Sequence, residues 1–196
     1  MAPVLVLYYS HKGATRNMAY KIATGVEMAG LEAQIRTVPP VTNHFDNELA
    51  AVPDSGDPYV SRDDLVACSG LALGSPTRFG NMAAAMKYFW DGTSHEWLSA
   101  ALAGKPACVF TSSSTMHGGQ ESTLLSMQLP LLHHGMVFIG LPYSEPALNK
   151  TTTGGTPYGV SHVAGMQGNT SLSDDEQQLC IAQGKRLANI ARLLGA

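Results

Sequence analysis

Charged residues are scarce in this sequence: only 14% of its 196 residues are Asp, Glu, Lys or Arg, and the formal net charge at pH 7 is -3. A protein that binds nucleic acid needs a basic face to displace the counterions of the phosphate backbone. No run of Lys and Arg supplies such a face, so we exclude nucleic acid as a partner. The low surface charge also suits a chain that buries part of its surface against copies of itself.

Cysteine is scarce as well. Cys68, Cys108 and Cys180 are far apart and form no CxxC pair, which argues against a disulfide framework and against a thiolate metal site. The apolar residues 1–10 have no basic segment and no small-residue cleavage site, so we expect no signal peptide. No apolar stretch approaches the roughly 18 residues of a spanning helix. We therefore expect a cytoplasmic protein without a membrane span.

The common motifs for dinucleotides and metals are missing. Neither GxGxxG nor the Walker sequence GK[ST] occurs. Residues 95–99 (HEWLS) begin like the zinc motif HExxH but end in serine. His133 and His134 are adjacent, and neighbouring residues on a helix point about 100° apart, which is unsuitable for chelating one ion. We expect no metal site.

Strand and helix patterns alternate five times along the chain. Apolar runs predict strands over residues 3–9, 33–38, 70–74, 106–110 and 136–139. Periodic apolar residues predict helices from about Thr15, over 82–90, over 123–132 and after the capping box at 173–176, with Pro130 ending or kinking the third. This alternation predicts an α/β fold, a doubly wound five-stranded parallel sheet with helices on both faces.

Two stretches interrupt this pattern. Residues 39–64 hold many prolines and polar residues, and we expect a long irregular surface connection there. Residues 141–170 are rich in Gly, Thr, Pro and Tyr and are too long for an ordinary connection. We interpret them as an irregular insertion in a single domain that spans residues 1–196.

Three polar loops should converge on one site, because ligands of doubly wound sheets bind beyond the carboxyl ends of the strands. These loops are residues 10–15, 76–81 and 111–119. The first joins a buried strand to a helix, and its glycine and hydroxyls suit either an anion at the helix N-terminus or an ordinary helix cap. The second combines a proline, an aromatic, a glycine and polar anchors, which suits a planar heterocycle or a turn with an exposed Phe.

Six segments together resemble one family. They are VLVLYYS (4–10), GSPTRFGNMAA (74–84), HGGQEST (117–123), LLHHGMV (131–137), GLPYS (140–144) and GGTPYG (154–159). Their order and spacing are similar to those of WrbA-type NAD(P)H:quinone oxidoreductases, tetrameric relatives of flavodoxin. The resemblance implies a flavodoxin-like fold, FMN as cofactor, NADH or NADPH and a quinone as substrates, and a homotetramer.

The resemblance also implies which residues form the site. Ser10, Gly13 and Thr15 correspond to residues that hold the FMN phosphate, within a loop that also contains His11, Lys12 and Ala14. Thr77, Arg78, Phe79, Gly80 and Asn81, after Pro76, correspond to residues that line the isoalloxazine. Ser112, Ser113, Ser114, Thr115, Met116, His117 and Gly118 correspond to the loop over its pyrimidine side. Phe79, Trp97 and His133 match the apolar slot over the flavin ring, where the nicotinamide and the quinone bind in turn.

The implied chemistry is a two-electron, ping-pong transfer. The flavin carries the reaction, while the protein supplies binding, orientation and electrostatics. We expect no essential side-chain acid, although His133 is placed to hydrogen-bond a quinone oxygen.

Two residues depart from the family pattern. Lys12 stands where the family usually has an aromatic, near the incoming nucleotide. Ser114 stands where glycine is expected, and a serine with positive φ costs roughly a kcal/mol or more. These departures put the affinity for FMN in question.

An alternative function is that of a flavodoxin-type electron carrier, which docks on protein partners and has no substrate of its own. Such carriers usually have a strongly acidic face, and a net charge of -3 does not provide one. A regulatory module that binds another protein is a third possibility, without a sequence feature in its favour.

Overall fold

The computed structural model describes residues 1–41, 52–53 and 55–195. Eleven of the 26 residues of the connection predicted over 39–64, residues 42–51 and 54, therefore lie outside the described residues. The strands are β1 (Val4–Tyr8), β2 (Ala33–Thr37), β3 (Gly70–Pro76), β4 (Pro106–Ser113), β5 (Val137–Phe138) and β6 (Val160–Val163). The helices are α1 (Ala14–Met28), α2 (Arg62–Ala67), α3 (Ala84–Asp91), α4 (Ser94–Leu98), α5 (Gln120–His133), α6 (Pro146–Lys150) and α7 (Asp174–Leu194).

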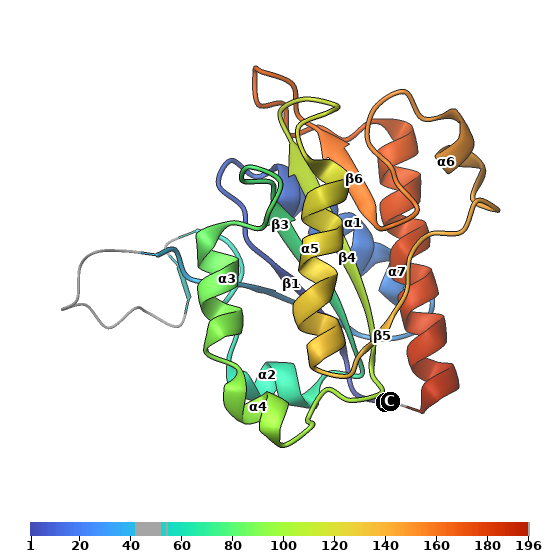
Figure 1. Ribbon diagram of the computed structural model, residues 1–196. Helices are drawn as coiled ribbons and strands as arrows, with labels where there is room; N and C mark the ends of the chain where they lie inside the picture. The colour runs from blue at the N-terminus through green and yellow to red at the C-terminus, as the bar shows by residue number, and fades with distance from the viewer. Residues whose placement is uncertain (42–51, 54, 196) are drawn as a thin grey trace.

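One parallel sheet organises the chain, in the order β2-β1-β3-β4-β5, with β6 also paired to β4. Every residue of β1, β3 and β4 is buried, as expected of strands that are covered on both faces. Helices α1 and α7 pack against one face of the sheet, and α3 and α5 pack against the other (Figure 1). The predicted doubly wound fold is confirmed.

The fifth position of the sheet is shared by two short strands. β5 pairs with the first two residues of β4, at Pro106 and Ala107, whereas β6 pairs with its last four. The chain leaves the sheet after β5 and returns at Gly159, where an added Cβ would lie 2.2 Å from the Val109 carbonyl oxygen. Only glycine permits such an approach.

The interpretation of residues 141–170 as irregular throughout is therefore wrong, because they contain α6 and β6. β6 is only four residues long and includes a buried polar residue, His162. A strand of this kind has no apolar run to reveal it.

Helix boundaries differ from expectation in smaller ways. α5 continues past Pro130 to His133, so Pro130 does not end it. The capping box before α7 is confirmed, because Ser173 Oγ accepts from Glu176 N and Ser173 N donates to Glu176 Oε2. The short helices α2, α4 and α6, of five or six residues, were not predicted. Among the described residues, no helix combines the length and apolar character needed to cross a membrane.

Candidate functional site

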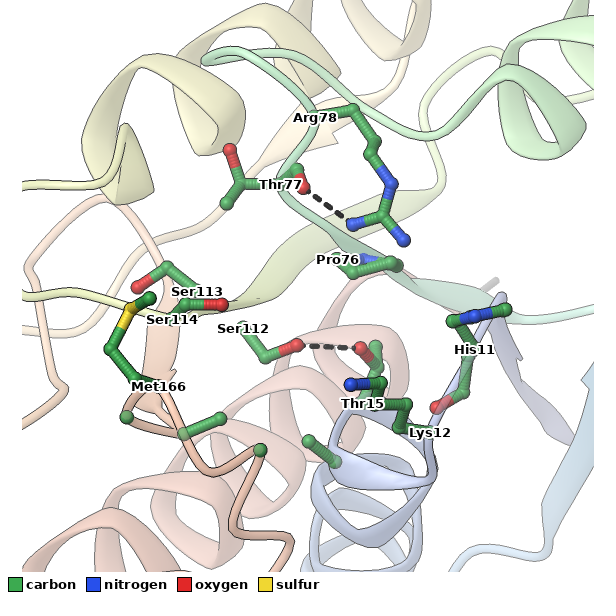
Figure 2. A pocket seen from close by; sticks show the side chains of 15 residues that line it. His11, Lys12, Thr15, Pro76, Thr77, Arg78, Ser112, Ser113, Ser114 and Met166 are labelled. Atoms are coloured by element: carbon green, nitrogen blue, oxygen red, sulfur yellow. Dashed lines mark hydrogen bonds between the residues drawn. The ribbon is translucent and has the colours of Figure 1, made fainter.

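The carboxyl ends of β1, β3 and β4 meet at one edge of the sheet, and the three predicted loops converge there around a pocket of about 260 Å³ (Figure 2). The residues of these loops that line it are Ser10, His11, Lys12, Ala14, Thr15, Pro76, Thr77, Arg78, Ser112, Ser113 and Ser114. The lining includes the cations Lys12 and Arg78 and, among the described residues, no carboxylate. The pocket therefore favours an anionic ligand.

The first loop presents the N-terminus of α1 to this pocket. Gly13, with φ of 101°, precedes the helix, and its amide donates to Ser10 Oγ over 3.0 Å. Among the described residues, no side chain caps the first turn of α1. Thr15 Oγ1 instead bonds to Ser112 Oγ over 2.9 Å and ties the loop to the end of β4. Ser10 Oγ thus caps only the amide of Gly13, and Gly13 has no side chain to cap the amides of the first turn. Uncapped helix amides are the donors that a phosphate group requires.

The second loop is a tight turn. Arg78 N donates to Asn81 O over 2.7 Å, and Asn81 N donates to Arg78 O over 3.1 Å. The two residues between them, Phe79 and Gly80, have φ values of 52° and 78°, as in a type I′ turn. A left-handed conformation costs a non-glycine residue about 1–2 kcal/mol. Such strain, in a Phe whose side chain is fully exposed, points to a functional role.

The third loop begins later than predicted, because β4 extends to Ser113. Ser114 is not among the described non-glycine residues with positive φ, which are Phe79 and Ala100. The strain considered for Ser114 is therefore absent, because the backbone there does not need glycine. Thr115, Met116, His117 and Gly118 are not in the pocket lining; Met116 and His117 face a neighbouring depression with Thr153 and Thr156.

A fourth wall of the pocket was missed by sequence reasoning. Ala164, Gly165, Met166 and Gly168, which follow β6, complete the lining. β6 is parallel to its neighbour, so its carboxyl end joins the same edge of the sheet as the other strands. The glycines of this segment were the available signal, but they were interpreted as part of the insertion.

The structure does not bring Trp97 and His133 to the pocket of their own chain. α5 starts beside Gly80 at the pocket edge and runs away from it for 14 residues, about 20 Å. His133 is at its far end, close to the start of β4, and Trp97 is on α4 at the same end of the molecule (Figure 1). Trp97 is half exposed.

Beside Trp97 and His133 in the chain are three buried polar residues, Thr93, Glu96 and His134. Thr93 Oγ1 donates to the Trp90 carbonyl and accepts from His134 Nε2 over 2.9 Å. Burial lowers the pKa of His134, against the opposing charge of Glu96.

Among the described residues, no group of three or more His, Cys, Asp or Glu side chains is arranged to hold a metal ion.

The parallel sheet has helices on both faces, and the loop 10–15 at its carboxyl edge presents a helix N-terminus to an anion. Together these features define a flavodoxin-like protein. A WrbA-like flavodoxin from Agrobacterium tumefaciens has a TM-score of 0.67 at 23% identity, covering 98% of this chain and 99% of that chain. A flavodoxin from Archaea has a TM-score of 0.65 at 20% identity, covering 97% and 99%.

Sequence comparison identifies the family. The family model described as NADPH-dependent FMN reductase matches residues 3–145. The NAD(P)H dehydrogenase (quinone) of Gluconacetobacter diazotrophicus is 42% identical over 100% of both chains, and that of Geotalea daltonii is 43% identical over 96% of each. The chain belongs to the NADPH-dependent FMN reductase family, and its resemblance to the WrbA-type quinone oxidoreductases is confirmed.

Proposed function

We propose that this protein passes electrons from NADH or NADPH to quinones in a ping-pong cycle. FMN-dependent oxidoreduction of these substrates is the activity of the family, and FMN is its cofactor. The observation that supports the assignment in this chain is the cationic pocket at the N-terminus of α1, whose first turn no described side chain caps. FMN held by these residues would supply the hydride and electron transfer, while the protein would supply binding and orientation.

Each loop has its own task in this proposal. The Ser10–Gly13 turn and Thr15 hold the phosphate, residues 77–81 support the isoalloxazine, and residues 112–114 cover its pyrimidine side with backbone donors. Donors at that side stabilise the negative charge of the reduced ring. The hydroxyl pair Thr15–Ser112 holds the first and third loops in fixed relation.

Steady-state kinetics test the cycle. With one slot shared by the nucleotide and the quinone, the oxidised nucleotide must leave before a quinone enters. We expect repeated turnover per FMN, and double-reciprocal plots whose lines stay parallel as the second substrate is varied. An electron carrier would give no sustained quinone reduction by itself, and intersecting lines would contradict the shared slot.

In their own chain, Trp97 and His133 lie at the end of the molecule opposite the pocket. They can contribute to substrate binding only if a second copy of the chain brings them to the pocket. The outer side of α5 supports such an assembly: Leu125, Leu129 and Leu132 are spaced four and three residues apart and are 44%, 59% and 54% exposed. An exposed apolar stripe of this kind marks an interaction surface. We therefore propose a homotetramer in which a neighbouring subunit supplies both residues.

Light scattering measures the assembly directly. We expect the mass of four chains at micromolar concentration. The change Leu129→Asp should shift the mass toward smaller species, because a carboxylate would be buried in an apolar contact. The exposed Val66, on α2, provides a matched control: Val66→Asp should leave the mass unchanged. A monomer of the wild-type protein would contradict the proposal.

Truncation of the slot residues should separate substrate binding from cofactor binding. Trp97→Ala should remove stacking worth about 0.5–1.5 kcal/mol and raise the quinone KM several-fold while FMN stays bound. His133→Ala should weaken quinone turnover by the loss of a hydrogen bond of similar strength. Kinetics normalised to flavin content measure both effects. Unchanged quinone kinetics in both variants would remove these residues from the slot.

We place the protein in the cytoplasm. Cys68, Cys108 and Cys180 are free and buried, and burial raises the pKa of the Cys108 thiol to about 12. Unpaired thiols of this kind suit a reducing compartment.

A further inference from the structure

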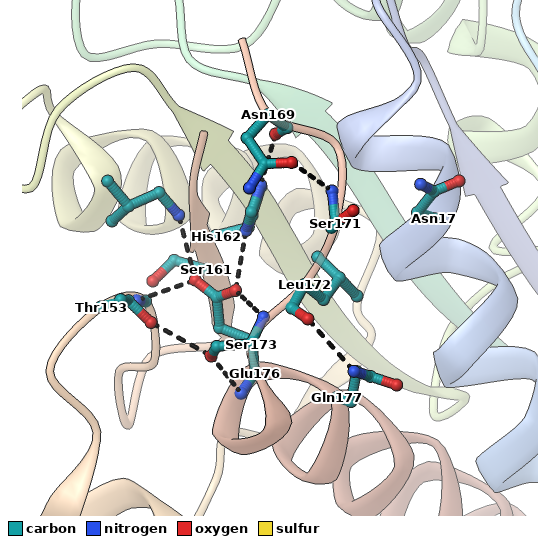
Figure 3. Close-up of polar contacts among 12 residues, drawn as sticks. Asn17, Thr153, Ser161, His162, Asn169, Ser171, Leu172, Ser173, Glu176 and Gln177 are labelled. Carbon is teal, nitrogen blue, oxygen red and sulfur yellow. Dashed lines mark hydrogen bonds and ion pairs between the residues drawn. The ribbon is translucent and has the colours of Figure 1, made fainter. Parts of the chain in front are cut away.

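A buried ion pair lies under the fourth wall of the pocket. His162 is on β6 and Glu176 is in the first turn of α7, and their side chains are each 1% exposed. The distance from His162 Nδ1 to Glu176 Oε2 is 2.8 Å (Figure 3). Charged groups this far from solvent are rare unless they are paired.

Glu176 is surrounded by donors. Besides His162, it accepts hydrogen bonds from the backbone amides of Gly154, Val163 and Ser173 over 3.0, 3.1 and 2.8 Å. Burial alone would raise the pKa of Glu176, but the bonds from His162 and Ser173, the His162 charge and the Val163 amide lower it to about 2. The carboxylate is therefore ionised near neutral pH.

His162 faces an acceptor on each side. Its Nε2 lies 2.9 Å from the carbonyl oxygen of Asn169, opposite the carboxylate of Glu176. Neither acceptor can donate, so both bonds exist together only if both ring nitrogens carry a proton. Burial alone would lower the pKa of His162, but the bonds to Glu176 and Asn169 and the carboxylate charge raise it.

Two further titratable groups on α7 lie near this pair, Cys180 and Asp175. Burial and the charge of Glu176 raise the pKa of the Cys180 thiol, so it stays neutral near neutral pH. Asp175, beside Glu176 on α7, pairs with Lys150 of α6 over 3.2 Å at the surface. On β4, the register places Ser112 opposite His162, and from α1 the amide of Asn17 reaches Thr170 O instead. Within the part of the chain that the structure describes, the titration of His162 is thus governed by Glu176.

The imidazole supports the loop that forms the fourth wall, residues 164–170. The amide of Ala164 fixes the start of the loop by donating to Ser113 O over 2.8 Å, and Asn169 N closes it by donating to Ala164 O over 2.7 Å. Asn17 of α1 holds its end at Thr170. The side chain of His162 contacts this loop by a hydrogen bond from Nε2 to the carbonyl oxygen of Asn169 (Figure 3).

We propose that His162 and Glu176 are positioning residues of the cofactor site: the imidazolium holds the 164–170 loop in the shape that completes the pocket, and loss of its proton weakens the binding of FMN. The inference rests on the proposed placement of FMN in this pocket. When His162 loses one proton to solvent, the remaining N–H stays with the carboxylate, which is the stronger acceptor. Asn169 O then faces a nitrogen lone pair, and the loop loses its support.

The direction of the pH effect follows from the raised pKa of His162. A histidine that is charged more easily in the folded state contributes fully below its ordinary pKa of about 6.5 and loses that contribution as pH rises through the higher value. Glu176 acts in the opposite range, because its lowered pKa removes support only below about pH 4.5. FMN affinity should therefore fall above neutral pH.

Titration of FMN fluorescence with the full-length apoprotein between pH 6.5 and 9.5 tests this. Loss of a hydrogen bond to a charged group should raise the FMN Kd of the wild-type protein roughly tenfold across the range. His162→Gln, which cannot ionise, should bind more weakly at pH 6.5 and show no such rise. His95→Gln, at an exposed histidine on α4, is the matched control and should follow the wild type. A His162→Gln protein that follows the wild-type pH course would overturn the proposal.

A second measurement on the wild-type protein needs no variant to fold. Nitrogen-15 NMR of the histidine rings should show both nitrogens of His162 protonated at pH 7, and a neutral His162 ring there would also overturn the proposal. Absence of FMN binding at every pH would instead contradict the proposed site. Binding that is independent of His162 would contradict only the positioning role.

Discussion

Replacement of Gly13 by valine should raise the Kd for FMN about a hundredfold. Gly13 has φ of 101° just before α1, where a β-branched residue is strained by about 1–2 kcal/mol or more. If the loop relaxes, the phosphate loses amide donors, each worth about 1.5–3 kcal/mol for a charged group. A combined loss of about 3 kcal/mol corresponds to two factors of ten in Kd. Equilibrium titration with FMN measures it.

Gly104 provides the matched control for this change. It has φ of 79°, an added Cβ there would meet no atom within 4 Å, and it precedes β4 at the end of the sheet away from the pocket. Gly104→Val should cost a similar amount of stability and leave the Kd for FMN unchanged. Equal loss of FMN affinity in both variants would show that strain alone, and not the phosphate loop, is responsible.

Among the substitutions proposed as tests, replacement of Gly184 by valine should give the largest loss of unfolding free energy. Gly184 lies where α7 crosses α1, and an added Cβ would be 2.0 Å from the backbone oxygen of Ile22 and 3.0 Å from Val26 N. Backbone cannot move aside as a flexible side chain can, so the helices must separate. We expect a loss of at least about 3 kcal/mol in unfolding free energy, seen as a melting temperature lower by about 6–12 °C or more.

The exposed Gln178, on the same helix, tests whether helix propensity explains the effect. Gln178→Val introduces the same β-branched side chain without a clash, and its cost should stay within about 0.5 kcal/mol. Thermal unfolding of the two variants under identical conditions gives the comparison. Similar melting temperatures for both would contradict the close packing of α1 on α7.

The fold was predictable because its signals are local. The five-residue apolar run of β1 and the four-residue spacing of Met18, Ile22 and Val26 identify a buried strand and a covering helix, and all of these residues are fully buried or nearly so. β6 carries no such signal: its pairing with the end of β4 depends on the return of a distant segment at Gly159. Contacts between distant segments leave little trace in local periodicity.

The candidate site also has one part that was predictable from local sequence and one part that was not. The loops after β1, β3 and β4 were predictable, since the carboxyl ends of parallel strands share an edge, and they line the pocket. The wall at Ala164–Gly168 was missed together with β6. The pairing of His162 with Glu176, 14 residues apart, was also missed, because Glu176 was interpreted only as a helix-capping charge.

The residues expected to form the apolar slot over the flavin ring show a different limit of prediction from sequence. Phe79 is next to the pocket, but Trp97 and His133 are at the other end of the chain, and similarity of sequence does not say which copy of a chain supplies a residue. The separation became evident only from the direction of α5, which carries His133 about 20 Å away from Gly80.

The two half-reactions, measured anaerobically by stopped flow, test the central claim most directly. Purified protein loaded with FMN is mixed first with NADH or NADPH and then, in its reduced form, with a quinone, while the flavin absorbance is followed. The account predicts that the nucleotide bleaches the flavin fully, and that one equivalent of quinone restores the oxidised spectrum without a semiquinone band. A flavin that the nucleotides do not reduce, or that quinones reoxidise only in one-electron steps, would contradict it.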